Sequence, residues 1–164
     1  MNEIDILREY LSKPKPKKTS KAPYRKPESV KDLERLHFEW KQKKHPDLPF
    51  QVQTKFRDDS ANELTKCVTA WLTIRGYFAG RVNTTGTYSQ KLGKYIHSGS
   101  KRGMADVTAV VNGRHVSIEV KYGKDRIRLE QSKVKAEIES AGGKYLVVSS
   151  FDDFLKQIAS INKA

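Results

Sequence analysis

The sequence predicts a mixed α/β fold in which a β-sheet is flanked by helices. Three observations lead to this class. Residues 60–74 keep apolar side chains at helical spacing, an Asn112-Gly113 pair separates two alternating apolar runs, and residues 127–161 read as helix, apolar strand and helix. With a short strand at residues 77–82, the element order is α-β-β-β-α-β-α, which is typical of a mixed sheet covered by helices.

The clearest helix of the chain begins at Ser60. Ser60 and Glu63 have the spacing of a capping box, and apolar residues then recur at helical spacing until Gly76, where a helix can end. Residues 77–82 form the next predicted strand. The polar segment of residues 83–102 is rich in Thr, Ser and Gly, so we expect a loop or irregular excursion there.

Asn-Gly between alternating runs is the strongest short signal for a β-hairpin, because both central positions of the turn need a positive φ. If the residues on either side of the turn face each other, Asp106 lies directly opposite Glu119. Opposed side chains have Cβ atoms roughly 4.5 to 5.5 Å apart, and like charges there are destabilising unless a cation lies between them. Lys121 shares this face, because side chains alternate with a period of two.

The two faces of this hairpin differ in polarity. A one-residue slip of one strand would exchange its polar and apolar faces, so the register is well specified. The polar face fits a divalent metal site for phosphodiester cleavage; the alternative is the solvated side of an amphipathic strand. The opposition of two like charges favours the metal site. The apolar face, which suits a core, consists of Val107, Ala109, Val111, Val116, Ile118 and Val120.

At these residues the chain resembles the PD-(D/E)XK nuclease superfamily, and within it the virus-type replication-repair nuclease (VRR-NUC) branch. The resemblance covers residues 62–148. Asp106, the Glu119-Val120-Lys121 triplet and Gln131 stand where that branch has its metal-binding Asp, its Glu-x-Lys and its helical Gln. Ala105 stands in place of the usual Pro. The resemblance implies an α/β fold with a restriction-endonuclease-like mixed β-sheet core.

The resemblance and simple chemistry assign a role to each residue. Asp106 and Glu119 would hold Mg²⁺, or Mn²⁺ in its place, with the backbone carbonyl of Val120 as a further ligand. A bound metal acidifies its water and neutralises charge at the scissile phosphate. Lys121 would orient or deprotonate that water, or stabilise the charged phosphate. Gln131 would position the water or a phosphate oxygen; the alternative is a surface glutamine on a charged helix.

Glu63 has two interpretations. The capping box explains it completely as a residue that starts a helix. In the resembled branch, a Glu on the first helix joins the metal site, and Glu63 is the matching position. It is therefore a catalytic candidate that ranks after Asp106 and Glu119.

The chain is strongly basic, with 32 Lys and Arg against 19 Asp and Glu and a net charge of +13, which indicates a polyanionic partner. Between Arg81 and Asp106 no acidic residue occurs, and basic residues alternate with tyrosines. Such a segment beside an acidic pocket suits contact with a nucleic-acid backbone; the alternative is a solvated loop of a basic protein. The predicted nucleic-acid-binding residues are Arg81, Lys91, Lys94, Lys101, Arg102, Lys124 and Arg126.

Residues 1–55 differ from the rest of the chain. Repeated Pro and like charge at residues 13–18 extend a chain, so we expect a basic arm with one or two short helices, at residues 1–11 and 29–44, before a nuclease domain at residues 56–164. The apolar stripe of the second helix would pack either on the nuclease domain or on another subunit. The arm has too few apolar residues for a signal peptide or membrane span. The single cysteine suggests a reduced compartment, so we expect a cytoplasmic protein, or a virus-encoded one acting in the host cytoplasm.

Two classes of function are consistent with these patterns. The first is a Mg²⁺-dependent DNA endonuclease of replication, recombination or repair, encoded by a cell or a phage, that acts on double-stranded or branched DNA such as a Holliday junction. Small stand-alone members of the resembled branch are junction-cleaving dimers, which implies a homodimer. The second is a non-catalytic, basic nucleic-acid-binding protein in which Asp106 and Glu119 are surface carboxylates.

Overall fold

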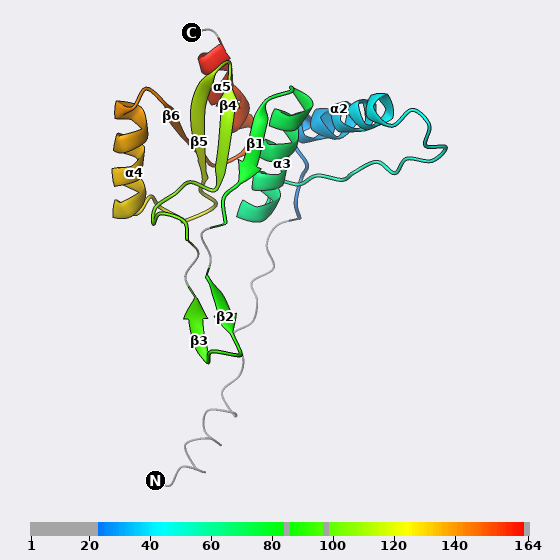
Figure 1. Ribbon diagram of the computed structural model, residues 1–164. Helices are drawn as coiled ribbons and strands as arrows, with labels where there is room; N and C mark the ends of the chain where they lie inside the picture. The colour runs from blue at the N-terminus through cyan, green and yellow to red at the C-terminus, as the bar shows by residue number, and fades with distance from the viewer. Residues whose placement is uncertain (1–22, 84–85, 97–98, 163–164) are drawn as a thin grey trace.

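The computed structural model describes residues 23–83, 86–96 and 99–162. The short helix expected at residues 1–11 lies outside them. None of the helices in these described ranges is long and apolar enough to cross a membrane. The elements, in chain order (Figure 1), are α2 Glu28–Lys44, α3 Ala61–Ile74, β1 Phe78–Arg81, β2 Thr87–Ser89, β3 Lys94–Ile96, β4 Val107–Val111, β5 Arg114–Val120, α4 Leu129–Ser140, β6 Lys144–Val148 and α5 Phe151–Asn162.

Four of the strands form one mixed sheet in the order β1-β4-β5-β6. β4 runs antiparallel to both β1 and β5, whereas β5 runs parallel to β6. The parallel pair needs a crossover connection, which α4 supplies. The predicted mixed α/β class is therefore confirmed, and the elements of this sheet and its helices follow the predicted order.

The turn between β4 and β5 has the predicted geometry. Asn112 has a φ of 51° and Gly113 a φ of 76°, so both central residues are left-handed. Val111 pairs with Arg114, and the ladder continues in this register to the pair of Val107 with Ile118. Asp106 comes directly before β4, so the same register brings it level with Glu119.

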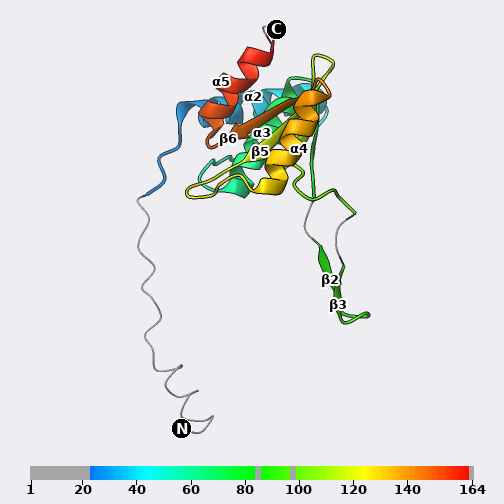
Figure 2. The same ribbon diagram turned by 90° about the vertical axis from the view of Figure 1, so that its left-hand side faces the viewer.

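Helices cover both faces of the sheet (Figure 2). α3 and α5 lie on one face, where the apolar side chains of β4 and β5 enter the main core. α4 lies over the other face, where Val134 packs with Ala105 and Tyr145. Because α4 covers that face, Glu119 is only 2% exposed and Ser117 is fully buried. This part of the polar face is not the solvated side of an amphipathic strand.

Helix α2 is packed against α3 and α5. Val30 and Leu33 are buried in the main core. Glu34 is buried too, and accepts hydrogen bonds from the backbone N–H of Phe56 at 2.7 Å and from Lys26 Nζ at 2.5 Å. Residues 28–44, which the sequence assigns to the basic arm, thus contribute to the same core as the sheet.

The prediction of a loop throughout residues 83–102 is wrong. β2 and β3 pair with each other and form a separate two-stranded sheet, with Tyr88 directly opposite Tyr95. The hairpin projects away from the helices and the main sheet in both views (Figures 1 and 2). The turn residues of this segment belong partly to the hairpin tip, where Gly93 has a φ of 58°. Thr and Tyr in the flanking positions favour strands.

Replacing Leu33 by alanine tests whether α2 is integral to the fold. Leu33 is 1% exposed, so Leu33→Ala should lower the free energy of unfolding by about 2 to 5 kcal/mol, through lost burial and a residual cavity. Leu48 is 55% exposed, and Leu48→Ala should change it by less than about 0.5 kcal/mol. Urea denaturation measures both; equal effects would mean that α2 is not part of the cooperative unit.

Candidate functional site

Asp106 is held over the carboxyl end of β5. Its Oδ2 accepts the backbone N–H of Val120 at 2.9 Å, and its own carbonyl accepts the N–H of Val82 at 2.8 Å. The first bond turns the carboxylate toward the neighbouring strand, and the second extends the pairing of β1 and β4 beyond the strand ends. Asp106 is half-buried, so its carboxylate is accessible at the rim of the sheet.

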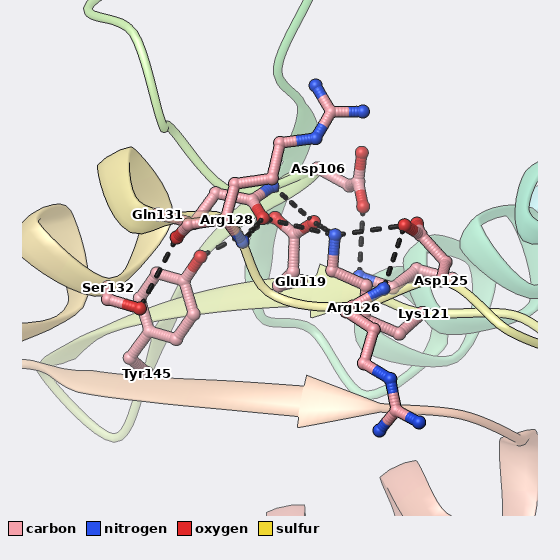
Figure 3. Close-up of polar contacts among 10 residues, drawn as sticks. Asp106, Glu119, Lys121, Asp125, Arg126, Arg128, Gln131, Ser132 and Tyr145 are labelled. Carbon is pink, nitrogen blue, oxygen red and sulfur yellow. Dashed lines mark hydrogen bonds and ion pairs between the residues drawn. The ribbon is translucent and has the colours of Figure 1, made fainter.

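Glu119 lies at the centre of a buried polar cluster (Figure 3). Its Oε1 accepts a hydrogen bond from Gln131 Nε2 at 2.6 Å and lies 2.9 Å from Lys121 Nζ. The hydroxyl of Tyr145 donates a longer bond, of 3.5 Å, to Oε2. The carboxylate is therefore bound at once to the residue that follows β5, to α4 and to β6.

Gln131 and Lys121 complete this cluster. Lys121 Nζ donates to Gln131 Oε1 at 3.1 Å and lies 3.4 Å from Asp125 Oδ2. Gln131 Oε1 also accepts the backbone N–H of Arg128 at 3.0 Å, one residue before α4. The amide of Gln131 is thus fixed, with its NH₂ toward Glu119 and its oxygen toward Lys121. It is not a free surface glutamine.

The electrostatics of the cluster are dominated by burial. Burial raises the pKa of Glu119, and the negative charge of Asp106 raises it further, while hydrogen bonds from Lys121 and Gln131 oppose the shift. The pKa of Tyr145 is also raised, first by burial and then by the charge of Glu119. A buried carboxylate needs a cation or hydrogen bonds to remain charged. In this structure Lys121 supplies the positive charge.

Gly103 allows the segment before Asp106 to contact the start of α4. It has a φ of +83°, and a Cβ at this position would lie 2.4 Å from the carbonyl oxygen of Glu130 and 3.0 Å from the backbone nitrogen of Gln131. Only a residue without a side chain permits this approach. Gly103 therefore sets how closely the chain that carries Asp106 approaches the helix that carries Gln131.

A cavity of about 300 Å³ opens beside this contact. Two arginines line it against a single acidic residue, so the cavity suits an anionic group. It adjoins the buried cluster through Gln131, which belongs to both. The lining residues are Arg102, Gly103, Met104, Arg128, Glu130 and Gln131.

The structure does not bring Glu63 to the two other carboxylates. No group of three or more His, Cys, Asp or Glu residues suited to a metal occurs in the described ranges. The N–H of Glu63 donates to Ser60 Oγ at 3.3 Å, and its carboxylate pairs with Lys66 at 2.6 Å. These contacts are those of a residue that starts α3.

The predicted nucleic-acid-binding residues are all exposed, and they fall into three groups. Lys91 and Lys94 lie on the β2–β3 hairpin, and the second group consists of Arg81, the last residue of β1, with Lys101 and Arg102, which lie between β3 and β4. Lys124 and Arg126 follow β5, and Arg126 points away from the carboxylates in Figure 3. Arg81 donates to Asn62 Oδ1 at 2.5 Å, and Lys101 pairs with Glu137.

Sequence reasoning did not identify Tyr145, Asp125 or Gly103 as parts of this site. For Tyr145 a signal was present: in a parallel pairing of β5 with β6, the side-chain period places it on the same face as Glu119. For Asp125 the only signal in the sequence was its position four residues after Lys121. Gly103 depends on a contact with α4 that no local pattern encodes.

A scan against models of protein families finds no match to the sequence, and a search of curated proteins finds none either. The resemblance to PD-(D/E)XK nucleases therefore rests on the motif residues alone.

Two glycine substitutions separate backbone strain from close contact. Gly103→Ala should lower the free energy of unfolding by about 1 to 3 kcal/mol more than Gly123→Ala. Both glycines have a positive φ, of +83° and +65°, but a Cβ at Gly123 would meet nothing within 4 Å. Thermal and urea unfolding of the two variants provide the comparison. Equal losses would show that the contact with α4 does not constrain position 103.

The buried ion pair gives a second prediction. Lys121→Met should cost about 3 to 5 kcal/mol, because it leaves the charge of Glu119 buried and unpaired. Adding Glu119→Gln should recover part of that loss, giving a coupling energy of about 1 kcal/mol or more in a double-mutant cycle. The exposed pair of Lys135 and Glu139, 4.0 Å apart, is the control and should couple by less than about 0.5 kcal/mol. Equal coupling in the two pairs would contradict the prediction.

Proposed function

We propose that the protein is a metal-dependent DNA endonuclease of the PD-(D/E)XK type with a restriction-endonuclease-like fold. One observation supports this most strongly. Asp106 and Glu119 stand at the same level on the two arms of one β-hairpin, and Lys121 and Gln131 are both bonded to Glu119. Two carboxylates and an ammonium at one end of the central strands β4 and β5 are the groups that metal-dependent hydrolysis of a phosphodiester needs.

The residues present fit a hard divalent cation such as Mg²⁺. Asp106, Glu119 and the carbonyl of Val120 offer only oxygen ligands, and Mg²⁺ is commonly bound by one or two carboxylates while it keeps several waters. When bound, the ion would supply an acidified water and neutralise charge at the scissile phosphate. The raised pKa of Glu119 is consistent with a site whose carboxylate is stabilised by added positive charge.

Lys121 and Gln131 would act directly on the reacting groups. The ammonium of Lys121 is buried and held between Glu119 and Gln131, so it would stabilise negative charge on the phosphate or, when neutral, accept a proton from the attacking water. Gln131 would orient the same water or a phosphate oxygen through its amide. Glu63 remains outside this proposal because its carboxylate pairs with Lys66.

The substrate would be DNA, double-stranded or branched, in replication, recombination or repair. The basic residues around the hairpin and after β5 would contact phosphates, and the cavity with Arg102 and Arg128 would take one next to the reacting group. Contacts to phosphate carry no sequence information, so selection would depend on the shape of the DNA, such as a Holliday junction. By the same resemblance, two copies of the chain would act together.

A non-catalytic, basic nucleic-acid-binding protein is the second candidate. The observation that favours it is that Lys121 already neutralises Glu119, with 2.9 Å between Nζ and Oε1. No third acidic or metal-binding side chain joins the two carboxylates in the part of the chain that the structure describes. In this case the cluster would only stabilise the packing of α4 on the sheet.

Cleavage assays discriminate the two candidates. The purified protein should cut supercoiled plasmid or synthetic four-way junctions with Mg²⁺ and not with EDTA. Asp106→Ala and Glu119→Ala should each lower the rate roughly 100-fold or more, because each removes a group that stabilises charge in the transition state. DNA binding should be retained in both variants.

The control is Asp152→Ala, which removes an exposed carboxylate of α5 and should leave the rate unchanged. Circular dichroism confirms that each variant is folded. Binding without cutting under all metals would favour the second candidate. Cutting that persists in both variants would place the activity in another site or in a contaminant.

A further inference from the structure

We propose that the β2–β3 hairpin is a stacking platform that receives an unpaired nucleobase on Tyr88 and Tyr95. This inference rests on the proposed function, because it names the feature of DNA that the site would select. The ligand is a base outside a duplex, as at a branch point or in a bubble.

The two tyrosines project from one face of the hairpin, and neither belongs to the hydrophobic core. Tyr88 and Tyr95 are directly opposite in the hairpin, so their side chains share one face. They are 56% and 57% exposed. The hairpin pairs with no other strand of the described chain. Large aromatic surfaces left open on a projecting element are typical of binding sites rather than of a core.

The local backbone supports the position of one ring. A Cβ on Gly86 would lie 2.9 Å from a ring carbon of Tyr95 and 2.4 Å from the carbonyl oxygen of Ile96. The ring of Tyr95 therefore lies against the glycine backbone, which no larger residue at position 86 would allow. This contact limits the motion of the ring and so lowers the entropy lost when a base stacks on it.

Charge favours a nucleic acid over a protein as the occupant. Lys91 and Lys94 are exposed on the same hairpin, and the sequence has no acidic residue between Arg81 and Asp106. A second copy of this chain, with a net charge of +13, would be repelled by this surface. Aromatic rings beside basic side chains are how single-stranded nucleic acid is bound, with bases on the rings and phosphates on the cations.

The described residues that flank the hairpin lie beside Asp106. The N–H of Val82 donates to the carbonyl of Asp106 at 2.8 Å, and Ser100 Oγ donates to the carbonyl of Asn83 at 2.9 Å. The described residues on either side of the hairpin, Val82 with Asn83 and Ser100, are thus joined to each other and to Asp106, which directly precedes β4. A base held on the hairpin would belong to a strand that passes close to the candidate site.

Equilibrium binding without catalysis tests the platform. Fluorescence anisotropy in EDTA would compare a duplex with the same duplex carrying a short central bubble. The double variant Tyr88→Ala, Tyr95→Ala should bind the bubble about 10-fold or more weakly, because stacking on each ring is lost, and the duplex within about twofold of the wild type. The variant Tyr88→Phe, Tyr95→Phe should retain bubble binding, because stacking needs the ring and not the hydroxyl.

Two controls separate stacking from charge and from general surface effects. Phe50→Ala removes an aromatic ring that is 93% exposed outside the hairpin, and should change neither affinity. Lys91→Ala with Lys94→Ala should weaken bubble and duplex by similar factors and reduce the salt dependence of both. Circular dichroism and thermal unfolding verify that the variants keep their fold.

The possible outcomes test the stacking platform separately from the proposed endonuclease activity. Equal losses for bubble and duplex in the alanine variant, or a loss in the phenylalanine variant as large as in the alanine one, would overturn the platform. The platform would also be overturned if the alanine variant, without DNA, sedimented differently from the wild type while its DNA binding was intact. The hairpin would then join two copies of the protein. Bubble-selective binding with no cleavage in Mg²⁺ would support the platform and reject the endonuclease.

Discussion

The arrangement of the site depends on one buried charge, that of Glu119. The carboxylate lies beneath α4, where an unpaired charge would cost several kcal/mol, so its neighbours must satisfy it. Lys121 does so from the position directly after β5 and Gln131 from α4, and Tyr145 adds a longer bond from β6. These bonds fix the rotation of α4 over the sheet, and a different placement of the helix would leave the carboxylate without partners. The same requirement means that a cation that replaced Lys121 would be stabilised there.

The hairpin that carries both carboxylates was predictable because local rules and the core agree there. Asn112 and Gly113 specify the turn, and the alternation of apolar residues specifies the register, so the level pairing of Asp106 with Glu119 follows from the sequence. The helix boundaries near Ser60 and Gly76 were predictable for the same reason. Each of these features is set by neighbours within a few residues, or by one buried face.

The features that the sequence did not predict arise from contacts between distant segments. The close approach of Gly103 to the start of α4 depends on where the helix is placed. The apolar stripe of α2 left two possibilities, packing on the domain or on another subunit, and the tertiary contacts of Val30 and Leu33 decide for the first. The β2–β3 hairpin was not predicted for a different reason. Its strands, around Tyr88 and Tyr95, are three residues long and bury no face, so no hydrophobic pattern marks them.

The two-residue turn also imposes a parity rule on the length of the chain. An antiparallel ladder pairs positions whose numbers have a constant sum, and this sum changes by one for every residue added at the turn. Adding an even number would let the ladder re-form with Asp106 and Glu119 again opposite each other, whereas an odd number would leave them staggered or force a bulge. Length variation between the carboxylates should therefore favour steps of two, and single added residues should be confined to a longer, bulged turn.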